Sequence, residues 1–100
     1  MILNESNFEE TIKNNELVLI DIWATWCPPC IAMNPVMEAI ENENKDIVVG
    51  KVNIDENGWI GEKYGVAAIP CFLFFKDGKQ IARLAGNQTK ETLLAKFKEV

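Results

Sequence analysis

Residues 23–30 read Trp-Ala-Thr-Trp-Cys-Pro-Pro-Cys, with two cysteines three positions apart. At the start of a helix, such a pair lies on one helix face with the Cβ atoms roughly 5–6 Å apart, and a small adjustment closes a disulfide. We expect Cys27 at the N-cap and Pro28 at the first helical position. An N–H group at that position makes no hydrogen bond within the helix, so a proline is tolerated there. The free N–H groups and the positive end of the helix dipole then favour the Cys27 thiolate. Cys30, one turn further in, is expected to stay protonated.

A Cys-X-X-Cys pair is also half of a structural zinc site, which needs two more Cys or His ligands. The chain has no histidine, and its third cysteine is Cys71. This shortage of ligands favours redox chemistry. A metal or cluster held by Cys27, Cys30 and Cys71 is the alternative from another functional class.

The composition limits the other functions. One domain over residues 1–100 is expected, because 48% hydrophobic and 25% charged residues are typical of a globular chain of this length. A net charge of −5 opposes binding to nucleic acid and to anionic membranes. The lack of histidine excludes Ser-His-Asp and Cys-His nucleophile pairs. The reacting groups are therefore carboxylates, thiols or amines.

The chain carries no sign of export or membrane anchoring. It does not begin with a basic segment followed by an apolar one, and it has no run of about eighteen apolar residues. Three cysteines are too few for the disulfide framework of a small secreted domain. We therefore expect a cytoplasmic protein.

The first half of the chain predicts alternating helices and strands. A capping box at residues 6–9 predicts a short helix that ends near residue 15. The apolar residues 17–24 predict a central strand covered on both faces, and residues 47–54 predict a second strand. The helix that begins at the cysteines contains Pro35, which is expected to kink it one turn later.

The second half predicts a short helix over residues 57–64, then a hairpin and a last helix. Apolar runs at 72–75 and 81–84 flank Asp77 and Gly78, a strong signal for an antiparallel hairpin. Thr89 is expected to cap the last helix. The apolar stripe of that helix comprises Leu93, Leu94, Phe97 and Val100.

The sequence resembles the thioredoxin family along nearly its whole length. Residues 23–30 are similar to the active-site segment of that family, and residues 51–55 resemble its third strand. Further positions match its buried aspartate, its kinking proline, the approach to its cis-proline and its late glycine, namely Asp21, Pro35, residues 64–70 and Gly86. The resemblance implies the α/β thioredoxin fold, a mixed sheet of four or five strands flanked by helices on both faces.

The resemblance also implies a protein-disulfide reductase. The Cys27 thiolate attacks a target disulfide, and Cys30 then attacks Cys27 to release the reduced target. Disulfide-containing cytoplasmic proteins are the implied targets, and a flavoprotein thioredoxin reductase is the implied partner that returns the pair to the dithiol. No bound cofactor is implied, and we expect a monomer.

Two charged residues are expected to assist the cysteines. Asp21 alternates with Leu19 and Trp23 on one strand face, so that it points into an apolar layer and its pKa rises. With the resemblance, this makes Asp21 the base that takes the Cys30 proton. Lys51 lies near Asp21 by resemblance and moderates its charge. An ordinary solvated lysine is the alternative for Lys51.

The expected target-binding residues surround Cys27. Trp26 and Pro28 adjoin the cysteine, and Trp26 is expected to form an apolar rim. By resemblance, Ile69 and Pro70 form a cis peptide that faces Cys27 and leaves the Ile69 backbone free to pair with an extended peptide. Gly86 keeps the neighbouring surface flat.

Three positions depart from the family pattern, which usually has Gly at Pro28, a basic residue at Ile31, and Thr or Val at Cys71. A second proline stiffens the loop and removes an N–H donor near the sulfur. The reduction potential is therefore open, and a thiol oxidase or isomerase is a further alternative. Cys71 is expected to be a small buried hydrophobe, with a third active thiol as the alternative.

Overall fold

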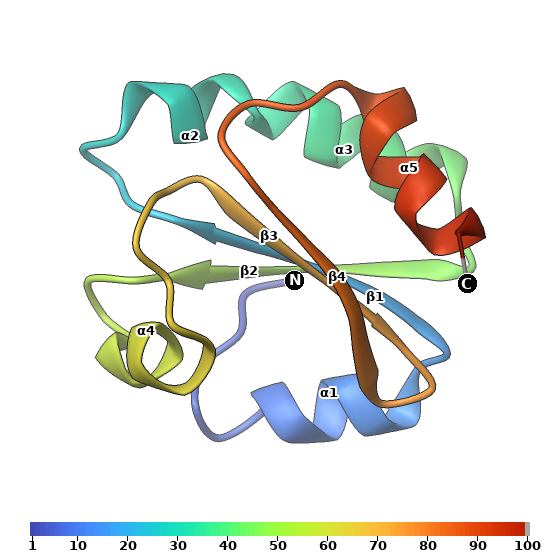
Figure 1. Ribbon diagram of the computed structural model, residues 1–100, viewed down its shortest axis with the longest axis horizontal. Helices are drawn as coiled ribbons and strands as arrows, with labels where there is room; N and C mark the ends of the chain where they lie inside the picture. Colours follow the sequence, from blue (N-terminus) through green and yellow to red (C-terminus); the bar gives the residue numbers. More distant parts are fainter. Residues whose placement is uncertain (100) are drawn as a thin grey trace.

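The computed structural model describes residues 1–99 and contains one mixed sheet of four strands in the order β2-β1-β3-β4 (Figure 1). The elements in chain order are α1 (Phe8–Asn14), β1 (Leu17–Trp23), α2 (Pro28–Ala32), α3 (Asn34–Glu43), β2 (Ile47–Asn53), α4 (Gly58–Tyr64), β3 (Cys71–Lys76), β4 (Lys79–Ala85) and α5 (Lys90–Lys98). This order confirms the predicted succession of elements, and the sheet confirms the predicted fold class.

The central strand is β1, as its apolar sequence predicted. It runs parallel to β2 and antiparallel to β3, and its five inner residues are buried. The parallel neighbour requires a crossover, which α2 and α3 provide. The predicted hairpin joins β3 to β4. Its two turn residues, Asp77 and Gly78, both have positive φ (52° and 82°), as the commonest two-residue turns between antiparallel strands require.

Helices cover both faces of the sheet, and each face has its own apolar core (Figure 1). On one face, α1 and α4 place Phe8, Ile12 and Ile60 against alternate residues of the strands. On the other face, side chains of α3 and α5 and alternate residues of the strands form a second core. It consists of Leu19, Met33, Met37, Ile40, Ile47, Val49, Phe72, Phe74, Leu93 and Phe97. Alternation along β1 therefore sends neighbouring side chains into different cores.

The predicted capping box at residues 6–9 is wrong. Helix α1 begins one residue later than predicted, with Asn7 instead of Ser6 as its N-cap residue. The Ser6 hydroxyl instead donates a hydrogen bond of 2.6 Å to Oδ1 of Asn4, which also accepts from the backbone N–H groups of Ser6 and Asn7. Asn4 thus competes for the Ser6 hydroxyl by forming its own local turn. The predicted end of the helix near residue 15 is confirmed.

The predicted kink at Pro35 is confirmed as a break between two helices. Helix α2 ends at Ala32, Met33 interrupts the ladder, and α3 begins at Asn34. A proline at position 35 cannot donate to the carbonyl group four residues earlier, so the hydrogen bonding is interrupted there. The cysteines therefore lie on a short helix that is separate from the longer α3.

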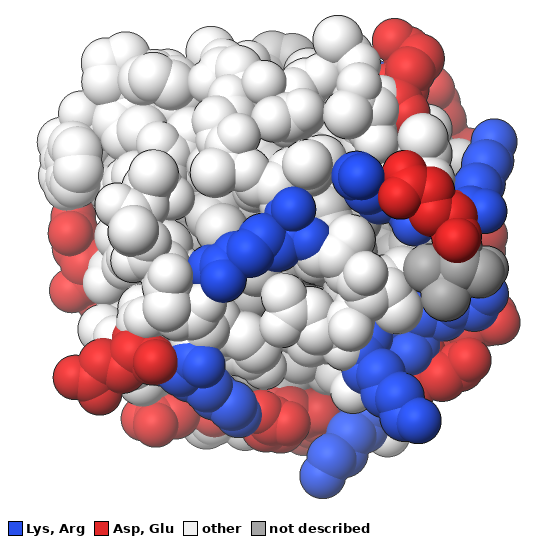
Figure 2. Space-filling model, in the orientation of Figure 1, with Lys and Arg blue, Asp and Glu red and all other residues white. Residues whose placement is uncertain are grey.

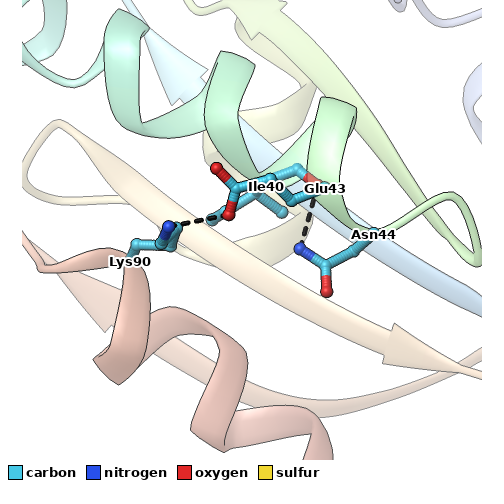
Figure 3. Close-up of polar contacts among 4 residues, drawn as sticks. All are labelled: Ile40, Glu43, Asn44 and Lys90. Carbon is cyan, nitrogen blue, oxygen red and sulfur yellow. Dashed lines mark hydrogen bonds and ion pairs between the residues drawn. The ribbon is translucent and has the colours of Figure 1, made fainter.

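Helix α5 packs against α3, and an ion pair joins their ends (Figure 3). Nζ of Lys90, the first residue of α5, lies 2.7 Å from Oε1 of Glu43, the last residue of α3. Asn44, the C-cap residue of α3, donates its side-chain N–H to the Ile40 carbonyl group at 3.1 Å and so closes the end of that helix. Thr89 caps α5 as predicted, by accepting the N–H of Thr92. Leu93 and Phe97 are buried, and Val100 of the predicted stripe lies outside the described residues.

The first residues of the chain cover the outer edge of β2. The Leu3 N–H donates to the Lys51 carbonyl group at 2.8 Å, and the Lys51 N–H donates to that of Met1 at the same distance. Leu3 is fully buried, and its side chain lies against Gly50, where a Cβ atom would overlap it and would come within 3.3 Å of Ile20 Cδ1. Among residues 1–99, no helix is long and apolar enough to cross a membrane.

We expect Gly50→Ala to lower the free energy of unfolding by about 1–3 kcal/mol, because the added methyl group displaces Leu3 from a filled core. Gly58→Ala is the matched control. Gly58 is the first residue of α4, a Cβ there meets nothing within 4 Å, and alanine favours the helix. Urea unfolding of both variants checks this. If the two variants were equally stable, residues 1–3 would accommodate the added methyl group without loss of stability, and the prediction would be wrong.

Candidate active site

The two cysteines lie where the central strand gives way to α2. Cys27 is the N-cap residue of α2, with Pro28 as the next residue, as predicted. Its Sγ atom accepts the backbone N–H of Cys30 at 3.2 Å. A helix N-terminus supplies this donor because its first N–H groups have no partner inside the helix. The backbone geometry at α2 therefore directs a hydrogen bond at the sulfur of Cys27.

Cys27 and Cys30 form a disulfide, with their Cα atoms 5.2 Å apart. Cys30 is fully buried and Cys27 is 4% exposed, so Cys27 is the outer sulfur by a small margin. Ala24 packs with the pair, and Trp23, Ile54 and Ile69 surround them. An apolar enclosure of this kind limits the access of water to the sulfurs.

Asp21 is a fully buried carboxylate in the middle of β1. Neither of its oxygens has a hydrogen-bond partner within residues 1–99. Phe72 of β3 and Lys51 of β2 flank it in the sheet, and it shares the face of Leu19 that α3 and α5 cover. Burial raises the pKa of Asp21 from 3.8 to about 6, and the positive charge of Lys51 acts in the opposite direction.

Lys51 is partly buried, and its ammonium group has two neighbours. Nζ lies 4.5 Å from the centroid of the Trp23 ring and donates a hydrogen bond of 2.6 Å to Oδ1 of Asn34. The sequence did not point to Asn34. No periodicity or motif marks that residue, whose contact with β2 arises from the break between α2 and α3.

The surface beside the disulfide is apolar. Trp26 is 66% exposed and Ile31 is 43% exposed, and Pro28 is exposed as well. In Figure 2, the surface over α2, at the upper left, carries no charged side chain, whereas charged side chains lie at the left edge, in the middle and along the lower and right-hand parts of this face. Trp26 Nε1 donates a hydrogen bond of 2.7 Å to Oδ2 of Asp55, a second contact that the sequence did not reveal.

The loop before β3 completes the surroundings. The Ile69–Pro70 peptide bond is cis, Pro70 is buried, and Ile69 packs against the cysteines. The Gly86 N–H donates to the Pro70 carbonyl group at 2.8 Å, and the positive φ of Gly86 (82°) favours glycine there. A shallow hollow of about 170 Å³ adjoins them, lined by Trp26, Ile54, Val66, Ala67, Ala68 and Ile69.

Cys71 lies apart from this group. It is buried, as predicted, in the core under α1 and α4, whereas Cys27 and Cys30 belong to a separate cluster. Nη2 of Arg83 lies 4.0 Å from its sulfur. Within the described part of the chain, no three Cys, Asp or Glu side chains are grouped so that they hold a metal ion.

Comparison with known proteins identifies this arrangement. The family model for thioredoxin matches residues 1–99. The chain belongs to the thioredoxin family. It is 42% identical to a thioredoxin of Chlamydia caviae over 93% of this chain and 90% of that protein, and 39% identical to one of Alicyclobacillus acidocaldarius over 100% and 96%.

Solved thioredoxins share the fold. Mitochondrial thioredoxin 3 of Saccharomyces cerevisiae in its oxidized form superposes with a TM-score of 0.91 at 32% identity, over 100% of this chain and 94% of that chain. A thioredoxin of Plasmodium falciparum gives 0.89 at 29% identity, over 99% and 98%. Thioredoxins are thiol–disulfide oxidoreductases, and with its Cys-X-X-Cys disulfide this chain is one as well.

We expect Asp21→Asn to stabilise the fold at pH 7. Between pH 3.8 and about 6, the folded protein keeps the Asp21 proton while the unfolded chain has lost it, so the free energy of unfolding falls as the pH rises through this window. Asparagine does not titrate, so the substitution removes this pH dependence of the free energy of unfolding. At pH 7 the gain is up to about 3 kcal/mol, and below about pH 4 it vanishes.

Urea unfolding at several pH values measures this difference. Asp46→Asn, at an exposed site, serves as the control and should stay within about 0.5 kcal/mol of the parent protein. A stability difference for Asp21→Asn that does not change between pH 4 and pH 7 would contradict the assignment.

Proposed function

We propose that this protein reduces disulfides of cytoplasmic target proteins and is itself reduced by a flavoprotein thioredoxin reductase. The observation that carries the proposal is the Cys27–Cys30 disulfide at the N-terminus of α2, in a chain that also holds an unpaired carboxylate inside the sheet. A single domain over residues 1–100 that acts as a monomer completes the proposal.

Cys27 is the attacking residue. Once the disulfide is reduced, the N–H of Cys30 and the end of the α2 dipole stabilise a negative charge on Sγ of Cys27. The thiolate attacks one sulfur of a target disulfide, a mixed disulfide forms, and the other target sulfur leaves as a thiolate. The slightly greater exposure of Cys27 supports this order of events.

Cys30 completes the reaction with the help of Asp21. Cys30 loses its proton, attacks Sγ of Cys27 and displaces the second target thiolate, which restores the Cys27–Cys30 disulfide. A carboxylate whose pKa is raised to about 6 is well suited to accept that proton near neutral pH. Lys51 lowers the free energy needed to ionise Asp21, and in this role it is not an ordinary solvated lysine.

The target peptide binds across the apolar surface around Cys27. Within residues 1–99, no backbone group pairs with the N–H or C=O of Ile69, which supports its pairing with an extended peptide. Trp26 and Pro28 form the rim on the other side of the disulfide. Gly86 and Pro70, joined by their hydrogen bond, form a flat floor beside Ile69.

The uncharged surface over α2 in Figure 2 agrees with recognition of varied targets through backbone pairing and apolar contact. The same surface is the docking site we propose for the reductase, because that enzyme must also reach Cys27. The odd number of cysteines supports a reducing compartment and therefore the cytoplasm.

We expect Cys30→Ser to trap the mixed disulfide, because no second thiol remains to release the target. Cys27→Ser should abolish reduction of a disulfide-linked peptide in the presence of a dithiol donor. Cys71→Ser is the control, and it should retain most of the activity since Cys71 belongs to another core cluster. Mass spectrometry of the trapped adduct and thiol release from the peptide give the readouts. An adduct on Cys71 would overturn this assignment.

The reduction potential separates a reductase from the oxidase or isomerase alternative. For a reductase we expect a value near that of thioredoxins, about −270 mV, rather than about −180 mV as in disulfide isomerases. Equilibration with a glutathione redox buffer, followed by alkylation and mass spectrometry, measures it. A value above about −200 mV would favour the alternative, in which the second proline at position 28 has made the disulfide easier to reduce.

A further inference from the structure

Lys51 lies opposite the buried Asp21 in the sheet, but the side chain that holds its ammonium group comes from a helix. Asn34 is the first residue of α3, immediately after the interruption at Met33. Its Oδ1 atom accepts the hydrogen bond of 2.6 Å from Nζ of Lys51, while the Trp23 ring lies under the same ammonium group. The break that follows the cysteine helix therefore brings an amide oxygen to Lys51.

We propose that Asn34 is a positioning residue for the release step: its amide oxygen holds the Lys51 ammonium beside Asp21 and so keeps that cation available to the carboxylate. This inference rests on the role proposed above for Asp21. An amide oxygen suits the task because it accepts a hydrogen bond without adding a negative charge. A carboxylate in its place would neutralise the ammonium group.

Other carboxylates line the hollows that Lys51 also lines. Glu38 and Glu41 of α3 line one of about 240 Å³, together with Met1. Glu56 lines another. The amino group of Met1 is bonded to the Val49 carbonyl group and lies 3.7 Å from Glu41. A flexible lysine freed from Asn34 can turn toward these exposed carboxylates and away from Asp21.

The surroundings of Asp21 leave Lys51 as its nearby cation. On β3 the opposite residue is the uncharged Phe72, and on β2 it is Lys51. Helix α2 carries no charged side chain, and its ionisable group, Cys30, is in a disulfide in the oxidised protein. Helices α3 and α5, which cover the same face, contribute apolar side chains to the core there, and none of their charged residues is buried, namely Glu38, Glu41, Glu43, Lys90, Glu91, Lys96 and Lys98. Among the described residues, Lys51 is therefore the charged group that acts most strongly on Asp21.

Titration of the Asp21 side-chain carboxyl by carbon NMR in the oxidised protein tests the proposal. Asn34→Ala should move the midpoint to higher pH, and Asn34→Asp should move it further because the new carboxylate neutralises Lys51. Asn34→Gln, which keeps an amide oxygen, should restore part of the effect. Asn42→Ala, an exposed asparagine on the same helix, is the matched control and should leave the midpoint unchanged. Circular dichroism verifies folding of each variant.

The release step is measured separately with dithiobis(nitrobenzoate) added to the reduced protein. Cys27 attacks the reagent, forms a mixed disulfide and displaces one coloured nitrothiobenzoate anion, and Cys30 then attacks Cys27 and displaces a second one, whose absorbance reports the release step. Since Asp21 has a pKa of about 6, we expect Asn34→Ala to slow this release roughly twofold near pH 6 and to leave it unchanged above about pH 8. Asp21→Asn should remove the dependence on this group.

The two measurements separate the possible failures. An unmoved Asp21 midpoint in folded Asn34→Ala and Asn34→Asp overturns the positioning role. A midpoint that moves without any change in the pH profile of release overturns the role of Asp21 as base, and with it the part of Asn34 in the reaction. Failure of Cys27 to react at all would instead overturn the proposed function itself.

Discussion

The buried carboxylate of Asp21 is the constraint around which the catalytic end of this protein is organised. Placing it in the central strand opposes folding at neutral pH, because neither of its oxygens has a hydrogen-bond partner in the described structure. A sheet with two complete apolar cores supplies enough burial to tolerate it. Lys51 of the neighbouring strand β2 contributes a compensating cation, and the cysteine helix α2 begins just past the end of β1.

The two halves of the site are controlled by different kinds of interaction. Cys27 is influenced by backbone N–H groups and by the dipole of α2, which depend on helix geometry rather than on side-chain identity. Asp21 is influenced by burial and by Lys51, which depend on packing and on a hydrogen bond to Asn34. Under the mechanism proposed above, we therefore expect substitutions at Pro28 to change the first step of disulfide exchange and substitutions around Asp21 to change the second.

Most of the fold could be predicted because local patterns and tertiary structure agree. The apolar run of β1, the Asp77–Gly78 turn and the proline after Cys27 each specify a local conformation that the structure contains. Of the residues that carry the family resemblance, Trp23, Ala24, Ile54 and Ile69 pack around the disulfide. The capping box failed because Asn4, an equally good hydrogen-bonding residue, lies two positions before Ser6, and the sequence does not rank such competitors.

The contacts that could not be predicted are those between polar side chains far apart in the chain. Asn34 with Lys51 and Trp26 with Asp55 depend on the angle between α2 and α3 and on the path of the loop after β2. Neither has a spacing or residue pattern of its own. The N-terminal residues cover the edge of the sheet at β2, so that β4 forms its open edge. Two features of that edge disfavour the pairing of one molecule with the next into a fibre: the charged residues Lys79 and Arg83, and the register shift opposite Phe74–Phe75.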